Sequence, residues 1–591
     1  MQVLRKAMPT CVLLAGWLLA ACGSSDTGAK TPTTPVTPVT PVTPVAPTPP
    51  ATVTLAAGAS ASVASGGMLS LVGGATGGEY VLVVADTATN GSSTAISYQV
   101  TALGITGAGG VSAPSTSLVP LAADAGSVSA PHLDYAFSAN LNARASSLLT
   151  PRFTAARRVR TNISAGVGAT FSVSAAPPAV GDLMTLNVSS RACDSLMPRG
   201  ARVVAIGAQS IVVADTLNPP GGFSAADYQR FATRFDTLVY PLDVANFGAP
   251  AAFGSSGKIV LFFTTAVNSL TPKSSTSFVG GFFFSRDLFP LFSTPELNSC
   301  PGSNESNLFY LLTPDPAGTV NGNIRRTGFV DSVTTSVLAH EFQHLINASR
   351  RLYVNKGATG FETVWLNEGL SHEAEELLFY HEGVSGPLQN LDVTAIRASV
   401  RLKDSFNANQ GGNAGRYRSY LLAPSTSSPI RNDDSLSTRG ATWDFLRYAA
   451  DRKTRSGGTD ASVWQALANS TTSGIANLRL VFGSNIGAML SDWSVSQYAD
   501  DVVPGVSADF SQPSWNWHSI YAALGGSPTA PSTYPLVVNG LTTAGAGGTV
   551  IPGASAFYRF SVAANATATV GITAGSSAAA NPVQGVVVRL R

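Results

Sequence analysis

Two histidines and a glutamate stand at a spacing that suits metal chemistry. The segment from Ser332 to Arg351 is SVTTSVLAHEFQHLINASRR, in which Glu341 directly follows His340 and His344 comes three residues later. In an α-helix, two side chains at this spacing project about 40° apart around the axis and one turn apart along it, so both imidazoles can bind one ion. Two neutral imidazoles and an open coordination position favour zinc, which lowers the pKa of bound water to about 7. We expect one Zn²⁺ per chain, with Glu341 accepting the proton of the zinc-bound water.

A downstream segment supplies the third ligand that a catalytic zinc site requires. WLNEGLSHEAEE begins at Trp365 and carries Glu368, which follows His344 after a loop that contains Gly357 and Gly360. That loop allows the chain to reverse, so two antiparallel helices would bring Glu368 against the histidine pair. We interpret the later carboxylates of the segment as a solvated helix face; these are Glu373, Glu375 and Glu376.

The helix prediction for the first segment depends on its start and on an apolar stripe. Ser332 is a suitable N-cap residue. The stripe recurs at helical spacing and consists of Val333, Val337, Leu338, Phe342, Leu345 and Ile346. Because HExxH also occurs by chance on ordinary amphipathic helices, the metal interpretation depends on the presence of Glu368.

The N-terminus has the pattern of an export signal. Arg5 and Lys6 precede the short apolar run Cys11–Leu19, which ends in the tetrapeptide LAAC at Cys22. This end resembles a bacterial lipobox, which implies cleavage before Cys22 and lipid attachment to it; an ordinary signal peptide is the alternative. We therefore expect a lipoprotein of the outer membrane, on its periplasmic or cell-surface side, or released from it, that touches the membrane only through its lipid.

The remaining cysteines indicate one disulfide. Of the four cysteines, Cys11 leaves with the signal and Cys22 carries the lipid, so Cys193 and Cys300 remain. In an oxidising compartment such a pair forms a disulfide that closes a long loop. Two separate buried thiols are the alternative, since the sequence does not give the distance between them.

The length of the chain and the residue patterns of its segments predict several domains. At 591 residues the chain is too long to fold around one ordinary hydrophobic core. We expect an α+β catalytic domain, built from a small mixed sheet and the two motif helices, with a helical C-terminal lobe and flanking β-sandwich modules. The expected divisions are a signal peptide at 1–21, a Pro/Thr-rich linker at 22–50, a β-module at 51–130, the catalytic domain at 131–382, the helical lobe at 383–525 and a second β-module at 526–591.

The charge balance argues against nucleic acid as a partner. Lys and Arg number 36 against 34 Asp and Glu, which gives a net charge of +2 and no basic footprint. We expect protein or peptide substrates as partners, from the metal motif described above. The oligomeric state does not follow from the sequence.

The motifs resemble those of a known peptidase clan. The gluzincins carry a second motif NExxSD, which Asn367, Glu368 and Ser371 match. HEFQHLINASRR followed by ETVWLNEGLS further resembles the hyicolysin family of bacterial neutral metallopeptidases, over about 201–380. The resemblance implies that His340, His344 and Glu368 bind zinc and that Glu341 is the catalytic acid/base.

One position departs from the clan's pattern. His372 stands where the gluzincins have an aspartate, which normally orients a ligand histidine. His372 could take that role as a weaker partner, or it could be a plain surface histidine.

Other functional residues stay open at this stage. A tetrahedral intermediate needs an oxyanion partner, for which the candidates are Tyr417, Tyr420, Arg439 and His518. The run Phe278–Phe284, FVGGFFF, is the candidate strand for pairing with an extended substrate, because its two glycines permit close approach.

These features predict an exported zinc endopeptidase in which Glu341 activates the water and returns its proton to the leaving amine. Two alternatives remain from the residues alone. One is a surface binding lipoprotein whose catalytic core has weakened activity. The other is a zinc hydrolase that cleaves amides other than those of proteins, because it would share every motif.

Overall fold

The computed structural model describes residues 51–107, 137–151, 153, 178–191, 193–254, 256–275, 278–524, 534–575 and 581–591. The expected signal peptide, Cys22 and the linker lie outside these residues. Within the described ranges, no helix has the length and apolarity needed to cross a membrane.

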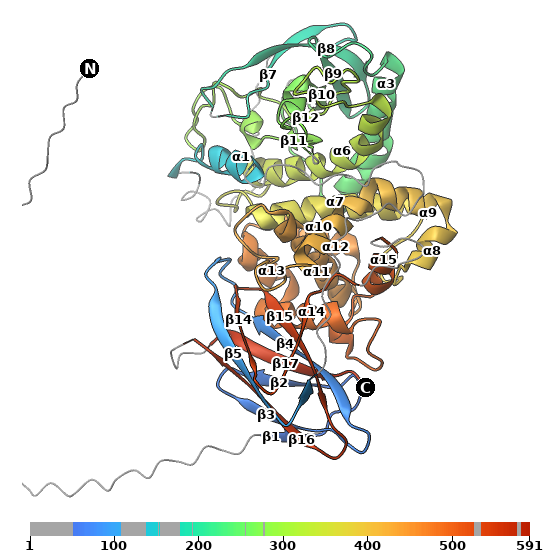
Figure 1. The fold of residues 1–591 in the computed structure, drawn as a ribbon. Helices are drawn as coiled ribbons and strands as arrows, with labels where there is room; N and C mark the ends of the chain where they lie inside the picture. Colours follow the sequence, from blue (N-terminus) through green and yellow to red (C-terminus); the bar gives the residue numbers. More distant parts are fainter. Residues whose placement is uncertain are drawn as a thin grey trace, which may run out of the picture. The chain divides into compact units, whose positions relative to one another are not determined.

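A six-stranded mixed sheet forms one layer (Figure 1, upper part). Its order is β11-β12-β10-β9-β8-β7, with β9, β10 and β12 parallel and the outer pairings antiparallel. The strands are β7 (Leu183–Asn187), β8 (Pro198–Ile206), β9 (Ser210–Asp215), β10 (Ile259–Phe263), β11 (Gly281–Phe283) and β12 (Leu308–Leu311). All five residues of β10, IVLFF, are buried, as expected for a central strand covered on both faces. The predicted mixed α+β architecture is confirmed.

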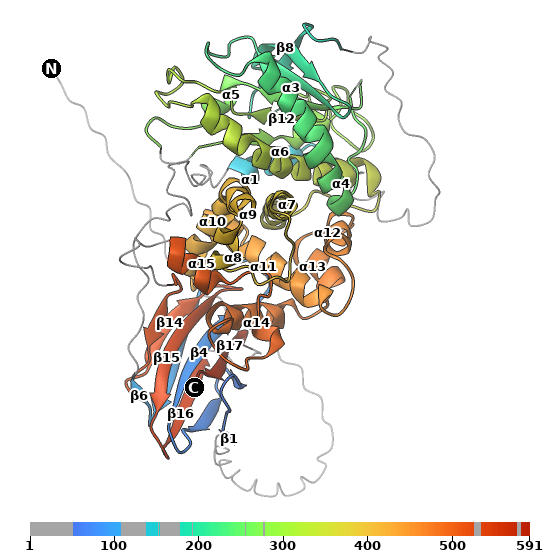
Figure 2. The same cartoon turned by 90° about the vertical axis from the view of Figure 1, so that its right-hand side faces the viewer.

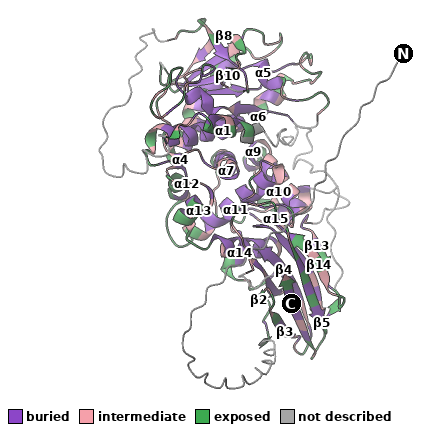
Figure 3. Cartoon of the chain, turned by 90° about the vertical axis from the view of Figure 1, so that its left-hand side faces the viewer, coloured by how far each residue is buried: buried purple, intermediate pink, exposed green. Residues whose placement is uncertain are grey.

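The metal-motif helix covers one face of this sheet. α6 (Thr327–Ser349) packs against β11 and β12 and against α4 (Tyr240–Phe247). It begins five residues before the expected start, so Ser332 is not its N-cap: the Ser332 hydroxyl donates to the Phe329 carbonyl inside the first turns. Most of the helix beyond Val333 is buried (Figure 3), which exceeds the single apolar stripe predicted from the sequence.

A helical lobe follows. α7 (Val364–Gly383) packs against both α6 and α11 (Leu436–Thr454), and α11 packs against α10 (Gly411–Leu421) (Figure 2). The other helices of the lobe are α8 (Val393–Ala398), α9 (Val400–Ser405), α12 (Asp460–Ala468), α13 (Gly474–Phe482), α14 (Ile486–Ala499) and α15 (Trp517–Leu524). Its core contains the fully buried Trp443, Trp464, Trp493 and Trp515.

Both ends of the described chain build one β-sandwich. Its sheets have the orders β1-β3-β16-β5-β14 and β13-β15-β4-β17-β2. The N-terminal strands are β1 (Ala51–Val53), β2 (Ser60–Ala64), β3 (Met68–Val72), β4 (Gly78–Asp86), β5 (Ile96–Leu103) and the short β6 (Thr106–Gly107), which pairs with β15. The C-terminal strands are β13 (Val538–Gly540), β14 (Ala546–Val550), β15 (Ser555–Val562), β16 (Thr567–Ala574) and β17 (Val583–Arg589).

This arrangement differs from the expectation of two separate β-modules. β4 lies between β15 and β17, and β16 lies between β3 and β5, so each segment fills gaps that the other leaves. The physical reason is strand pairing: neither segment alone places a hydrogen-bonded neighbour on both sides of its central strands. The two segments have similar residue patterns because their strands lie in the same two sheets.

The sandwich also packs onto the helical lobe. Leu82 and Val84 of β4 belong to the sandwich core, whereas Val81 and Val83, on its other face, belong to the core shared with the lobe helices. β4 is therefore buried on both faces, which explains its unbroken apolar run.

The predicted disulfide is confirmed. Cys193 and Cys300 are bonded, with their Cα atoms 5.0 Å apart. The bond joins the β7–β8 connection to the loop that precedes β12.

A truncation tests the shared sandwich. Deleting residues 534–591 should abolish the single cooperative melt of the chain, because β4 would lose both of its strand neighbours, β15 and β17. Deleting residues 1–50 is the matched control and should leave the melt unchanged, since β1 begins at Ala51. Circular dichroism melts and limited proteolysis measure both. A truncated chain that melts cooperatively at the wild-type temperature would contradict the assignment.

Candidate metal centre

The contact between α6 and α7 brings the predicted ligands together. His340 and His344 lie on α6 and Glu368 on the first turns of α7, all buried. Nε2 of His340 lies 3.6 Å from Glu368 Oε2, and Nε2 of His344 lies 3.6 Å from Glu368 Oε1. The three side chains form one compact group of donor atoms.

The donor set fits a metal ion. Ligands about 2.0–2.1 Å from a tetrahedral zinc are separated from one another by about 3.4 Å, close to the spacings to Glu368. Burial lowers the pKa of His344 to about 4, so its imidazole is neutral and can coordinate. Although burial opposes it, the Arg439 guanidinium holds the pKa of Glu368 well below its usual range, so this ligand is ionised.

Glu341 lies beside the ligand group and is fixed by the sheet. Its Oε2 accepts a hydrogen bond from the backbone N–H of Phe283 on β11 at 2.8 Å. Burial raises the pKa of Glu341 to about 7, against the opposing effect of His340. A carboxyl group with this pKa can both accept and donate a proton near neutral pH.

A pocket contains these groups. It is lined by His340, Glu341, His344, Glu368 and Arg439, and by residues of β11, of α1 (Phe137–Ser146) and of the loop before α7. Its apolar lining includes Leu141, Val279, Phe282, Phe361 and Val364. Among the strands that the structure describes, β11 lies at the edge of its sheet, with β12 on its inner side.

One glycine of this strand has a packing role. A Cβ at Gly281 would lie 2.7 Å from Cγ1 of Val337 on α6 and 2.8 Å from the Tyr310 carbonyl oxygen. Gly281 is therefore required for the close packing of β11 over α6.

Of the four oxyanion candidates, the structure places only Arg439 at the pocket. Tyr417 and Tyr420 are fully buried and stack on each other among the aromatic side chains of the helical lobe. His518 stacks on Tyr534, away from the ligand group. These three do not line the pocket.

Arg439 is held by two carboxylates. Its Nη1 lies 2.9 Å from Glu368 Oε2, and its Nε donates to Asp434 Oδ1 at 2.6 Å. Two glycines permit the approach of α11: a Cβ at Gly369 would lie 2.5 Å from Cγ2 of Thr442, and one at Gly440 would lie 2.2 Å from a backbone carbon of α10. Each glycine directly follows a functional residue, Glu368 or Arg439.

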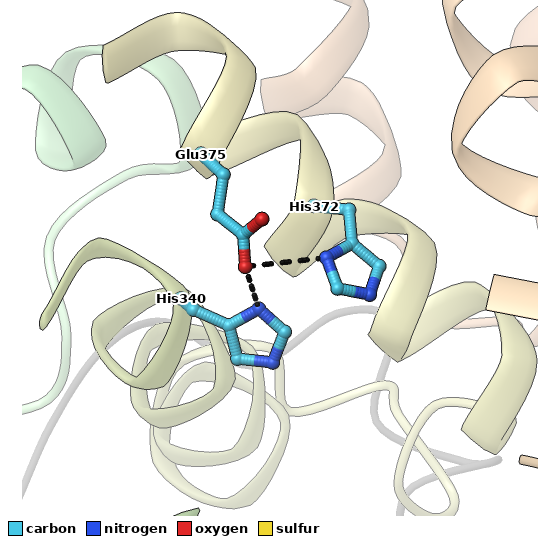
Figure 4. Close-up of side chains that lie close together, drawn as sticks. All are labelled: His340, His372 and Glu375. Atoms are coloured by element: carbon cyan, nitrogen blue, oxygen red, sulfur yellow. Dashed lines mark hydrogen bonds and ion pairs between the residues drawn. The ribbon is translucent and has the colours of Figure 1, made fainter. Parts of the chain in front are cut away.

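The expectation of a solvated face beyond Glu368 is wrong. Glu373 and Glu376 are 0% exposed and Glu375 is 7% exposed, because α7 is covered by α6 on one side and by α9 and α11 on others. His372 is 0% exposed, so it is not a surface histidine. Its Nδ1 lies 3.3 Å from Glu375 Oε1, which in turn lies 2.8 Å from His340 Nδ1 (Figure 4).

Sequence reasoning did not assign a role to Glu375, Arg416 or Asp434. Glu375 follows Glu368 by seven residues, which places both on one helix face, and this spacing could have indicated its role. Arg416 and Asp434 stand in no motif, so only the packing of the lobe shows them.

Comparisons with known proteins agree with a metal site. No protein-family model matches the chain. Over 149 residues the chain is 29% identical to the neutral metalloprotease ShpI of Staphylococcus hyicus, a match that covers 25% of this chain and 30% of that protein. This partial similarity supports a relationship to metalloproteases, and the buried group His340, His344 and Glu368 could bind the metal such a relationship implies.

The buried glutamates of α7 predict a pH dependence of stability. Burial and the neighbouring Glu376 raise the pKa of Glu373 well above its usual value, while Glu376 accepts from the Trp515 indole and faces Arg447. At pH values between the pKa of Glu373 in the unfolded state and its higher pKa in the folded state, only the folded state keeps the carboxyl proton. The free energy of unfolding therefore falls as pH rises, by up to about 1.4 kcal/mol per pH unit.

Glu373→Gln replaces the titrating carboxyl group with a neutral amide. The free energy of unfolding of the variant, relative to that of the wild type, should therefore increase from pH 5 to pH 8. Urea denaturation at several pH values measures the difference. A difference that does not change with pH would contradict a protonated Glu373.

Proposed function

We propose that this chain is a zinc-dependent endopeptidase. The observation that carries the proposal is the pocket in which His340, His344 and Glu368 converge at metal-ligand spacing, with Glu341 beside them. The similarity to a neutral metalloprotease supports the same reaction class. We take zinc as the metal because two imidazoles and one carboxylate suit it.

Each functional residue of the pocket has its own role in the proposed reaction. Zinc, when bound, supplies Lewis-acid polarisation of the substrate carbonyl and of water. Glu341 accepts the proton of the attacking water and passes it to the leaving amine, a role that its pKa of about 7 suits. The Arg439 guanidinium at the pocket stabilises the negative charge that develops on the carbonyl oxygen.

The edge strand gives the pocket a way to hold a polypeptide. An extended substrate can pair with β11 through backbone hydrogen bonds, which fits cleavage within a chain. The apolar lining from α1, β11 and the loop before α7 favours an apolar side chain next to the scissile bond.

We further propose that the enzyme acts outside the cytoplasm as a lipoprotein attached through Cys22. The Cys193–Cys300 disulfide supports an oxidising compartment. The LAAC sequence supports the lipid attachment.

Replacing the proton carrier tests the mechanism. Glu341→Gln should lower kcat for cleavage of denatured casein by about 100- to 10,000-fold, because the amide cannot accept the proton. Bound zinc should remain near one per chain. Glu382→Gln, near the end of α7 and paired with Arg234, is the control and should keep wild-type activity.

Retained turnover in Glu341→Gln would rule out the assignment. A wild-type protein that binds zinc and cleaves no peptide in a broad library, but hydrolyses other amides, would show the alternative reaction class.

A second substitution tests the oxyanion role. Arg439→Lys keeps a positive charge but loses the planar fork that bridges Glu368 and Asp434, so kcat/KM should fall by about 100-fold. Tyr417→Phe removes a buried hydroxyl that does not line the pocket, and it should leave kcat/KM unchanged. Equal losses in the two variants would contradict the role of Arg439.

A further inference from the structure

The two ring nitrogens of His340 face different carboxylates. Nε2 lies 3.6 Å from Glu368 Oε2, on the side of the ligand group. Nδ1 lies 2.8 Å from Glu375 Oε1, a hydrogen-bond distance (Figure 4). Both carboxylates come from α7, so one helix holds the imidazole at both nitrogens.

The contact with Glu375 determines what Nε2 can do. An ionised carboxylate only accepts hydrogen bonds, so Nδ1 must carry the hydrogen in this contact. In a neutral imidazole, Nε2 then carries the lone pair on the side of His344 and Glu368, where the Ser371 hydroxyl also lies 3.2 Å from it. This is the tautomer and ring orientation that a metal at the ligand group requires.

Two further buried side chains lie close to Glu375. His372 Nδ1 lies 3.3 Å from Glu375 Oε1, and Arg416 Nη1 from α10 lies 3.6 Å from Oε2. Asn413 connects the two: its Oδ1 accepts from Arg416, and its Nδ2 donates to the His372 carbonyl. His372 is 0% exposed and Arg416 is 4% exposed, so water competes little for these contacts.

Helix geometry explains why a glutamate at this position reaches His340. Side chains on a helix lean toward its N-terminus, so a residue covers the surface of the preceding turn. Glu375 therefore covers the turn that contains His372. The ring of His372 lies 4.8 Å from that of His340, so position 372 is also close enough for a short carboxylate to reach the same nitrogen.

We infer that Glu375 is a positioning residue of the candidate metal centre, which orients His340 through Nδ1, with the charge of Arg416 nearby. The inference deepens the proposed function, on which it rests for the identity of the metal. The carboxylate that the sequence motif lacks at position 372 is supplied from one turn farther along α7.

Zinc affinity tests the inference without any substrate. Glu375→Ala and the isosteric Glu375→Gln should bind zinc about 10- to 100-fold more weakly than the wild type, measured by competition with a chromophoric chelator. Glu373→Gln is the matched control, since it changes a buried glutamate of the same helix that contacts no ligand. It should keep wild-type zinc affinity.

A double variant that moves the carboxylate from position 375 to position 372 should restore zinc binding. In the double variant His372→Asp/Glu375→Ala, the aspartate lies one turn closer to Glu368 and can accept from His340 Nδ1. Zinc affinity should return to within about tenfold of the wild type. A loss of packing alone would not be repaired by this exchange. Melts of the metal-free proteins show whether each variant folds, and Glu375→Gln remains informative if Glu375→Ala does not.

The outcomes separate this inference from the proposed function. Folded Glu375→Gln or Glu375→Ala with wild-type zinc affinity would overturn the role of Glu375, and so would a double variant as weak as Glu375→Ala. A wild-type chain that binds no zinc would instead overturn the proposed metal. Weakened zinc binding in the Glu375 variants supports the inference even if the wild type cleaves no peptide.

Discussion

The structure around the pocket depends on the burial of charge between α6 and α7. A carboxylate removed from water is stable only when hydrogen bonds and opposite charges replace its hydration. Glu368 meets this requirement through Arg439, and Arg439 through Asp434. Glu375 meets it through His340, His372 and Arg416. Because Arg416 lies on α10, Arg439 on α11 and Asp434 on the chain between them, the helical lobe is part of the candidate metal centre.

The sheet and the lobe make different contributions to the same pocket. β11 fixes Glu341 through a backbone amide and offers an open edge. α10 and α11 supply the guanidinium groups, and Gly369 and Gly440 allow these helices to approach at the required distance. A substitution at either glycine would move a charge relative to its partner, so packing and electrostatics are coupled at these positions.

The sequence predicted those features that local patterns specify. The mixed α+β class, the two motif helices and the convergence of His340, His344 and Glu368 follow from composition, periodicity and spacing. The burial of Glu373, Glu375 and Glu376 did not follow, because a run of charges is exposed on most helices and only the third layer of helices covers this one.

The sandwich shows a second limit of sequence reasoning. Strand texture identified both terminal segments as β, but pairing between residues more than 400 positions apart leaves no local trace. Similarly, Tyr417, Tyr420 and His518 were reasonable polar candidates until the aromatic packing of the lobe placed them elsewhere. Only Arg439 combined the required chemistry with a position at the pocket.

The shared sandwich has a consequence for the order in which the chain can fold. β4 pairs with β15 and β17, for example Val83 with Phe557 and Val586, so its hydrogen bonds must wait for the last part of the described chain. Contacts of such large sequence separation form slowly, because the intervening loop must first close. The sheet and the helices of the pocket have all emerged by then. β2, β4 and β5, which pair only with C-terminal strands, therefore remain unpaired for the longest time, and an exported chain would need protection from aggregation until its final strands arrive.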